Sequence, residues 1–300
     1  MKRIARSLKG GFKYIKNLRR RVSSQGLYSA GHYYSPIPSK EDVISYVKSR
    51  LPPTSSISGI RTNEEFQHKL LDDYVVFYKD LTFPEKPTPG HRYFYKNSWF
   101  SYSDAIFLYC FLRKNQPKKI VEVGSGFSSA VMLDTVDEFF PQRPNITFIE
   151  PYPDRLKGLL KETDSQQVTL IEKRVQEVSL DIFQSLQSGD LLFIDSSHVV
   201  KCGSDLQFLI FEVLPRLQAG VFVHFHDVFY PFDYPSEWLM EGRYWNENYF
   251  LRAFLSWNTE WDIHFFNTYV HFMFGELIKE KMPLCAKNIG GSLYIQRAEG

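Results

Sequence analysis

From Lys118 onward the chain alternates short apolar runs with segments of helical periodicity, and this alternation constrains the fold more than any other feature. Continuous apolar strands that alternate with helices indicate a parallel sheet buried on both faces. Right-handed crossovers then give a doubly wound α/β fold with helices on both faces of the sheet. The predicted strands are Ile120–Val123, Ile146–Glu150, Val168–Glu172, Asp190–Asp195, Gly220–His224, Trp261–Phe266 and Ser292–Gln296. The predicted helices of this region are Ser128–Phe139, Pro153–Lys161, Asp205–Leu214 and Asn246–Trp257.

The first 60 residues do not follow this pattern. Residues 22–60 are rich in Ser, Pro and Gly, which indicates a linker with one short helix near Lys40–Arg50. Another helix is predicted over Asn63–Tyr78. We therefore expect a basic N-terminal segment and linker over residues 1–60, and one α/β domain over residues 61–300.

The N-terminal segment is strongly basic. Residues 1–40 contain ten Lys and Arg side chains and no Asp or Glu. Apolar residues recur there at intervals of three or four, at Ile4, Leu8, Phe12, Ile15 and Leu18. This spacing predicts a basic amphipathic helix over Met1–Arg21, an N-terminal helical extension. Such a helix could dock weakly on an anionic membrane or a partner, or it could be a solvated leader.

Composition and cysteine spacing limit the kinds of partner, metal site and cellular compartment to expect for this protein. A formal net charge of +2 gives no reason to expect a nucleic-acid partner. The three cysteines, Cys110, Cys202 and Cys285, form no C-x-x-C pair, which excludes a zinc ribbon and favours a reducing compartment. The apolar run Ala105–Leu112 is far shorter than the roughly 20 residues of a membrane span. With no secretory apolar stretch after the basic start, we expect a soluble, cytoplasmic protein.

Four of the predicted strands, the first, second, fourth and fifth, end in or are followed by acids or histidines. In open α/β sheets, ligands bind outside the carboxyl ends of the strands. A purely structural sheet does not require charged residues there, so these strand ends predict a binding and catalytic site. The residues concerned are Glu122 with Gly124, Glu150, Asp195, and His224 to Asp227.

The first of these strand ends opens a glycine loop within Val121–Ala130. Gly124 and Gly126 allow a tight turn and a close approach of the backbone to a ligand. Ser129 stands where a dinucleotide fingerprint has its third glycine, and the Glu122 carboxylate would repel a pyrophosphate. A cofactor with an ammonium or sulfonium suits this loop better. Glu150, at the end of the second strand, can accept hydrogen bonds from both hydroxyls of a ribose.

These residues resemble the class I S-adenosylmethionine-dependent methyltransferases, and within them a bacterial group that modifies small molecules or sugars. The resemblance extends from Trp99 to Trp257 and includes the last strand. Its segments are SWFSYSDA, VEVGSGFSSAVML, ITFIEPYPDRL, GDLLFIDSSHV, GSDLQFL, LPRLQAGVFVHFHDVFYPFDYP, WNENYFLRAFL and GGSLYIQR. It implies a Rossmann-like seven-stranded sheet and S-adenosylmethionine as cofactor. The cofactor-binding residues it implies are Glu122, Gly124, Ser125, Gly126, Glu150, Gln176 and Asp195.

The ends of the fourth and fifth strands supply the predicted catalytic residues, and three interpretations remain open. In the first, Asp195, His226 and Asp227 bind a divalent metal (Mg²⁺, Mn²⁺ or Fe²⁺), as related O-methyltransferases do with carboxylates; the histidine is a departure that disfavours Mg²⁺. In the second, His198 or His226 is the general base and Asp195 or Asp227 fixes its tautomer. In the third, the histidines only cap loops.

The segment Phe229–Tyr249 is long and aromatic, which is typical of a lid over the acceptor. Aromatic faces such as Trp245 stack on sugars or planar acceptors. We therefore expect methyl transfer to a hydroxyl of a small molecule or sugar by direct displacement. The alternatives are an NAD(P)-dependent oxidoreductase on the same fold, and a non-catalytic adaptor that acts through the basic N-terminus.

Overall fold

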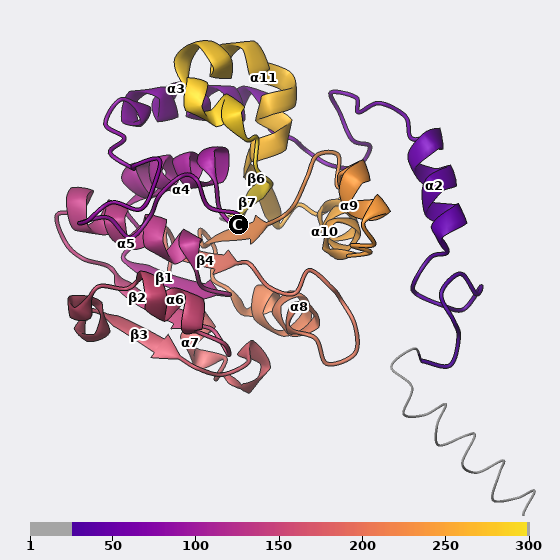
Figure 1. Cartoon of the computed structure of the whole chain (residues 1–300), viewed down its shortest axis with the longest axis horizontal. Coiled ribbons are helices and arrows are strands. Elements are labelled where there is room, and N and C mark those ends of the chain that lie inside the picture. The colour runs from indigo at the N-terminus through magenta and orange to yellow at the C-terminus, as the bar shows by residue number, and fades with distance from the viewer. Residues whose placement is uncertain (1–25, 299–300) are drawn as a thin grey trace, which may run out of the picture. The chain divides into compact units, whose positions relative to one another are not determined.

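The computed structural model describes residues 26–298 and contains one seven-stranded sheet with the order β3-β2-β1-β4-β5-β7-β6 (Figure 1). The strands are β1 (Lys119–Val123), β2 (Asn145–Ile149), β3 (Val168–Ile171), β4 (Leu191–Ile194), β5 (Phe222–His226), β6 (Trp261–Phe266) and β7 (Ser292–Arg297). The seven predicted strands are therefore all present, and the α/β class is confirmed.

Helices precede, connect and follow these strands along the chain. The α-helices are α2 (Lys40–Ser49), α3 (Glu64–Tyr78), α4 (Tyr102–Asn115), α5 (Phe127–Phe139), α6 (Asp154–Leu159), α7 (Asp181–Gln184), α8 (Asp205–Phe208), α9 (Ser236–Met240), α10 (Glu247–Leu255) and α11 (Asn267–Lys281). The chain moves from β1 through α5 to β2, and from β4 through α8 to β5, in opposite directions across the sheet. Right-handed crossovers therefore place α5 and α8 on opposite faces.

The sheet is parallel over β1 to β5, as the apolar runs predicted. The last two strands differ, because β7 pairs antiparallel with both β5 and β6 and lies between them. The fifth strand was also predicted two residues too early. Gly220 has a φ of +80° and belongs to the turn before the strand, so β5 runs from Phe222 to His226.

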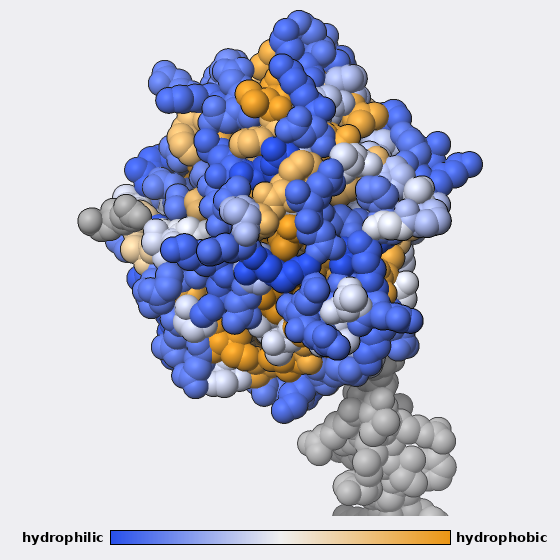
Figure 2. All heavy atoms as spheres, turned by 90° about the vertical axis from the view of Figure 1, so that its left-hand side faces the viewer, coloured by the Kyte–Doolittle hydropathy of each residue, from blue (hydrophilic) through white to orange (hydrophobic). Residues whose placement is uncertain are grey.

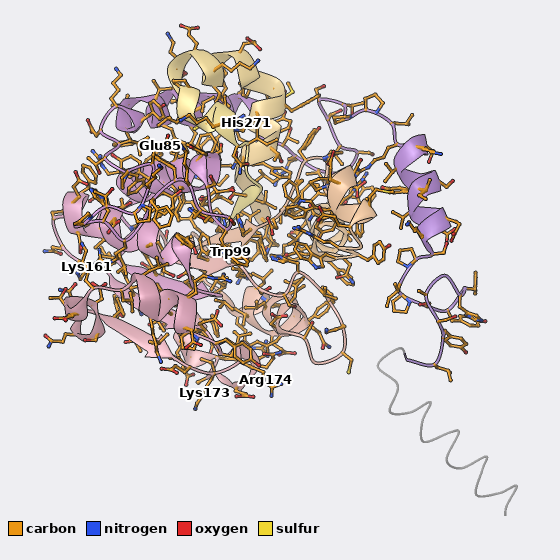
Figure 3. All side chains as sticks on the ribbon, viewed as in Figure 1. Glu85, Trp99, Lys161, Lys173, Arg174 and His271 are labelled. Carbon is orange, nitrogen blue, oxygen red and sulfur yellow. The ribbon has the colours of Figure 1, made fainter. Side chains whose placement is uncertain are left out.

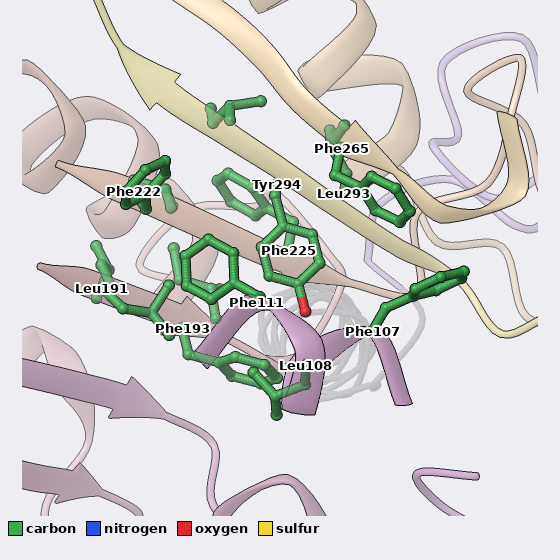
Figure 4. Packing of buried hydrophobic residues seen from close by; sticks show 14 of the residues in the cluster. Phe107, Leu108, Phe111, Leu191, Phe193, Phe222, Phe225, Phe265, Leu293 and Tyr294 are labelled. Carbon is green, nitrogen blue, oxygen red and sulfur yellow. The ribbon is translucent and has the colours of Figure 1, made fainter. Parts of the chain in front are cut away.

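Two long helices were not predicted. Residues Ala105–Leu112 of α4 are completely buried, so the helix has no polar face and shows no amphipathic period. The second helix, α11, is interrupted at Phe274, where φ is −126° and ψ is 28°. Figure 4 shows how α4 packs against the sheet: the Phe111 ring lies edge-on to Phe222 at 5.1 Å, and Phe107 edge-on to Phe265 at 4.7 Å. A helix enclosed in this way is indistinguishable by periodicity from a buried strand.

The chain divides into two compact units. In the first, residues 26–52 associate with Tyr234–Tyr244, and the Arg50 guanidinium donates to the carbonyl of Tyr234 at 2.7 Å. The second unit comprises Pro53–Asp233 and the residues from Trp245 onward, and it contains the whole sheet. The predicted lid Phe229–Tyr249 is thus shared between the units and contains α9. A domain boundary at residue 60 stays a prediction.

The surface in Figure 2 is mainly hydrophilic, with separate apolar patches. None of the helices within residues 26–298 has the length and apolar character needed to cross a membrane. The predicted basic helix Met1–Arg21 lies outside the described residues.

Candidate active site

The glycine loop (Gly124–Gly126) follows β1 and is held between the two neighbouring strands. The amide of Gly124 donates to the carbonyl of Ile149 at 3.0 Å, and the amide of Asp195 donates to the carbonyl of Val123 at 2.9 Å. Gly124 has a φ of +82°, and a Cβ there would lie 1.7 Å from the carbonyl oxygen of Asp195. Both the dihedral angle and the available space therefore require glycine at position 124.

Glu122 is held by two serines at the start of α5. Its side chain is completely buried, and its carboxylate accepts hydrogen bonds from the Ser128 hydroxyl at 2.6 Å and from the Ser129 hydroxyl. The Ser129 oxygen in turn accepts from the amide of Gly126 at 2.9 Å. Burial raises the pKa of Glu122 to about 8, although the serine hydrogen bonds act against this rise. Glu122 thus ties the glycine loop to the start of α5, and a direct contact with the cofactor stays a prediction.

A cavity of about 550 Å³ opens at the carboxyl ends of β1, β2 and β4. Four of the predicted cofactor residues line it: Gly124, Glu150, Gln176 and Asp195. Its other lining residues include Tyr152, Arg174 (labelled in Figure 3), Ser196, Lys201 and Ser204. Glu122, Ser125 and Gly126 are not among its lining residues. The volume is within the range of about 300–1,000 Å³ that small-molecule sites occupy.

Glu150 is fixed at the rim of this cavity by two backbone amides. Its Oε1 accepts from the amide of Tyr152 at 2.8 Å and its Oε2 accepts from the amide of Ser125 at 3.1 Å. A carboxylate can accept about four hydrogen bonds, so acceptor capacity remains for hydroxyl groups of a ligand.

Two buried polar atoms of the cavity lining indicate that the cavity suits a polar ligand. Among the described residues, Gln176 Oε1 and Ser196 Oγ have no hydrogen-bond partner. The Gln176 amide nitrogen is anchored on the carbonyl of Gly203 at 2.9 Å, which fixes the orientation of the free oxygen. Unsatisfied buried polar atoms are costly, and a nucleoside could satisfy both. The chain thus offers a glycine cradle, a carboxylate for ribose and polar atoms for a base, a set that fits S-adenosylmethionine.

Trp99 and Asp104 lie in the segment SWFSYSDA, which precedes the first strand of the sheet. Trp99 (labelled in Figure 3) is 59% exposed, and the Arg155 guanidinium lies 3.6 Å from the centre of its ring. Asp104 is buried and accepts from the Asn267 side chain at 3.1 Å and from the amide of Gly291 at 2.9 Å. Asp104 therefore joins the start of α4 to the segment before β7.

Five side chains meet beyond the ends of β4 and β5 and form the His198 cluster: Asp195, His198, His226, Asp227 and Glu247. His198 Nδ1 is 2.8 Å from Glu247 Oε2. His198 Nε2 is 3.5 Å from Asp195 Oδ1 and 3.6 Å from Asp227 Oδ2. His226 Nε2 is 3.6 Å from Asp227 Oδ1. The imidazole of His198 is therefore enclosed by three carboxylates, one on Nδ1 and two near Nε2.

These carboxylates determine the protonation of His198. Burial by itself lowers the pKa of His198, but the hydrogen bond and charge of Glu247, with the charges of Asp195 and Asp227, raise it to about 9. Burial also raises the pKa of Asp227 and of Glu247. A histidine with this pKa is a stronger base than a free imidazole, and it is largely protonated at neutral pH.

The two histidines of β5 have different environments. Alternation along the strand predicted that His224 and His226 share one face, and their rings lie 6.1 Å apart and nearly parallel. His224 stacks on Phe193 at 3.9 Å, and burial lowers its pKa well below the usual value. His226 has its pKa raised, because Asp227, Asp195 and Asp104 together outweigh the effect of burial. His224 is thus a neutral core residue, and His226 belongs to the cluster.

The predicted metal ligands Asp195, His226 and Asp227 are close together, yet they do not form a metal site. Within residues 26–298, no group of three or more His, Cys, Asp or Glu side chains has the geometry to hold a metal ion. The imidazole of His198 lies between the carboxylates of Asp195 and Asp227. The donor set in this arrangement does not fit a divalent ion.

Glu247 was not predicted from the sequence. It is the first residue of α10 and 49 positions from His198, so no spacing rule connects the two. In the sequence it is an ordinary acid at a helix start, where carboxylates are common. Trp245, which was predicted for the acceptor side, lies with its ring 4.4 Å from that of His198.

The sheet order and the cavity at the glycine loop define the fold and cofactor site expected of a class I methyltransferase. Comparison with known proteins agrees with this class. A family model described as a methyltransferase domain matches residues 121–228. An uncharacterized protein of Archaeoglobus fulgidus is 35% identical over 172 residues, which are 54% of this chain and 75% of that protein. The chain belongs to the class I S-adenosylmethionine-dependent methyltransferase family and is a methyltransferase.

Solved structures with a similar fold include two methyltransferases. One is the Podospora anserina methyltransferase PaMTH1 bound to SAH, at 14% identity and a TM-score of 0.41, covering 88% of this chain and 98% of that one. The other is the O-methyltransferase TomG from Streptomyces achromogenes in complex with SAM, at 13% identity and a TM-score of 0.39, covering 86% and 96%.

Proposed function

We propose that the protein transfers a methyl group from S-adenosylmethionine to a hydroxyl oxygen of a small molecule, with His198 as the proton acceptor. The observation that carries this proposal is the position of Asp195. This residue lines the cofactor cavity, and its Oδ1 is 3.5 Å from His198 Nε2. The nitrogen that would accept a proton therefore lies beside the cavity.

The proposal assigns cofactor binding, proton removal and stabilisation of the resulting charge to different residues of the chain. Gly124, Glu150 and Gln176 hold S-adenosylmethionine, which supplies an electrophilic methyl group on a positively charged sulfur. His198 Nε2 removes the proton of the acceptor hydroxyl, and Asp195 and Asp227 stabilise the imidazolium that forms. Alignment of the acceptor with the methyl group contributes the largest part of the rate enhancement.

The pKa of His198 favours an acidic hydroxyl as acceptor. A base with a pKa of about 9 takes a proton readily from a phenol, whose pKa is near 10, as in tyrosine. The Trp245 ring, 4.4 Å from that of His198, offers an aromatic surface beside the same nitrogen. We therefore place phenolic acceptors before sugar hydroxyls.

Three further sequence-based hypotheses complete the proposal. A divalent metal at Asp195, His226 and Asp227 is the alternative to a histidine base that the sequence left open, and the arrangement of these side chains disfavours it. The basic residues 1–21 are a candidate contact for an anionic membrane surface. A cytoplasmic location is consistent with three free cysteines, of which Cys110 and Cys285 are buried. Family membership disfavours both the NAD(P)-dependent oxidoreductase and the non-catalytic adaptor.

The first experiment is calorimetric titration of the full chain with S-adenosylmethionine and S-adenosylhomocysteine. We then expect labelled methyl groups to reach phenols in a panel that contains catechol, 4-nitrophenol, p-nitrophenyl glucoside and an aromatic amine. Turnover should rise with pH toward about 9, because only neutral His198 can accept a proton. Methylation of the amine alone would overturn the hydroxyl proposal. Loss of all activity after exhaustive chelation, with recovery on adding Mn²⁺ or Mg²⁺, would favour the metal.

A further inference from the structure

The helix α10 contacts His198 at both its backbone and its side chain. The amides of Asn246 and Glu247 both donate to the carbonyl of His198, each at 3.2 Å. The Glu247 carboxylate, one residue into the helix, is 2.8 Å from His198 Nδ1. The start of α10 therefore holds both the backbone carbonyl and the imidazole of His198. The imidazole cannot rotate without breaking the contact between Nδ1 and Glu247.

The backbone at His198 is in an unusual conformation. Its φ is +59°, in the left-handed region that side-chain-bearing residues rarely adopt, and Asp227 on the other side of the cluster has a φ of +57°. Such conformations cost about 1–3 kcal/mol each and are concentrated at functional sites. The conformation is consistent with a ring that must lie in one orientation.

Burying the Glu247 carboxylate costs desolvation free energy that a purely structural contact to His198 would not require. The residue is completely buried, and its Oε1 has no hydrogen-bond partner among the described residues. A backbone carbonyl or an amide would hold Nδ1 without burying a carboxylate that is half satisfied. The cost indicates that the carboxylate is retained for its effect on the imidazole.

We propose that Glu247 is a positioning residue that keeps the proton of His198 on Nδ1, so that the lone pair of Nε2 faces the acceptor site. The proposal rests on the proposed function only for the use made of that lone pair. The groups that face His198 are Glu247 from α10, Asp195 after β4, Asp227 after β5, and the Trp245 ring. Of these, Glu247 alone contacts Nδ1 at hydrogen-bonding distance.

The first test is a spectroscopic one that needs no acceptor. Two-bond ¹H–¹⁵N spectra of the full chain with ¹⁵N-labelled histidine distinguish the two neutral tautomers, and the His198 signals are assigned as those lost in His198→Asn. At a pH above that of the His198 titration, we expect the wild type and Glu247→Gln to carry the proton on Nδ1, because the Gln oxygen still accepts from it. Glu247→Leu should shift the ring toward the Nε2-protonated form.

Asn246→Ala is the matched control. Asn246 holds the same loop one position away, since its Oδ1 accepts from the amide of Val200 at 2.6 Å, but it does not touch the imidazole. We expect its tautomer to match the wild type. If Glu247→Leu also keeps the proton on Nδ1, or if Asn246→Ala changes the tautomer as much as Glu247→Leu does, the proposal is wrong. Should Glu247→Leu fail to fold, the wild type decides: a neutral His198 that carries its proton on Nε2 would overturn the proposal.

A second readout uses labelled methyl transfer to the most rapidly converted phenol of the panel above. We expect Glu247→Leu to lower kcat about 100-fold and Glu247→Gln about tenfold or less, with the affinity for S-adenosylhomocysteine unchanged. A loss confined to cofactor affinity would overturn the positioning role. Failure of the proposed function has a different signature: His198→Asn would then keep full turnover while the tautomer results remain as expected.

Discussion

The glycine loop and the His198 cluster both place buried carboxylates at the ends of neighbouring strands, but they use them in opposite ways. In the glycine loop, Glu122 finds both of its partners, Ser128 and Ser129, within seven residues of itself. In the His198 cluster, Glu247 meets His198 across 49 residues and keeps one oxygen without a partner among the described residues. A carboxylate whose oxygens both accept hydrogen bonds from nearby residues, such as Glu122, stabilises the local fold. A carboxylate that contacts a distant ionisable group and keeps one oxygen without a partner among the described residues, such as Glu247, can act on the protonation of that group.

The two regions also differ in the protonation states of Glu122 and His198 at neutral pH. Burial raises the pKa of Glu122 to about 8, so this acid is largely neutral at pH 7. The carboxylates around His198 raise its pKa to about 9, so this base is largely charged at the same pH. Glu122 therefore contributes little charge at pH 7, whereas His198 is a charged group at the ends of β4 and β5.

The largest expected effect is that of His198→Asn. If this substitution left kcat unchanged, the His198 cluster would have no catalytic role and would not differ in function from the glycine loop. Asparagine keeps polarity but cannot accept the proton, so kcat should fall by about 10²–10⁴-fold while the affinity for S-adenosylhomocysteine stays the same. Single-turnover assays and calorimetry measure the two quantities. His91→Asn, outside both regions, is the control. Equal turnover in His198→Asn and wild type would remove the catalytic role from the cluster.

The second largest effect is expected for Gly124→Ala, because the added Cβ at position 124 would clash with the backbone of Asp195. The new Cβ would lie 1.7 Å from the Asp195 carbonyl oxygen and would require a strained φ. We expect a loss of about 3 kcal/mol or more in the free energy of unfolding, measured by denaturant titration. Gly158→Ala is the matched control, since a Cβ there meets no atom within 4 Å. A Gly124→Ala variant as stable as that control would contradict the close approach of β1 and β4.

Glu122→Gln sharpens the distinction between the regions through pH. Folded Glu122 retains its proton up to about pH 8, whereas the unfolded carboxyl loses it near 4.5, so the folded state binds more protons in this window. Wild-type stability should therefore decline from about pH 4.5 to 8, by up to about 1.4 kcal/mol per pH unit from this group, and level off above pH 8.

The glutamine variant lacks this contribution, so its stability should be less dependent on pH. The measurement is the free energy of unfolding of both proteins at matched pH values. Identical pH dependence would show that Glu122 is ionised in the fold. A large loss of cofactor affinity in the variant would instead restore the role predicted from the sequence, a direct contact with the cofactor.

The smallest expected effect is that of Trp245→Ala. Removing the ring beside His198 should raise the KM for a phenolic acceptor about tenfold, which corresponds to about 1.4 kcal/mol of binding. The affinity for S-adenosylhomocysteine should change less than twofold. Trp257→Ala, at a residue that is 82% exposed, is the control. Equal losses for acceptor and cofactor would show that Trp245 supports the whole site rather than the acceptor side.

The sequence determined the sheet and the glycine loop because both depend on neighbours in the chain. Apolar runs predicted all seven strands, and Gly124 was recognisable because a tight turn after a strand demands glycine. Helix α4 was missed for the converse reason: its surroundings, not its own residues, bury every side of it. The antiparallel insertion of β7 between β5 and β6 was also invisible, since strand order depends on contacts far apart in sequence.

Only the tertiary structure decided which charged residues act together. The strand-end rule predicted Asp195, His198, His226 and Asp227, but it could not rank the three interpretations of them. Folding brought Glu247 to His198 Nδ1 and turned Glu122 toward two serines. The physical reason is that a pKa depends on the burial and charges within a few ångströms, and these distances are set by the packing of strands and helices that the sequence separates widely.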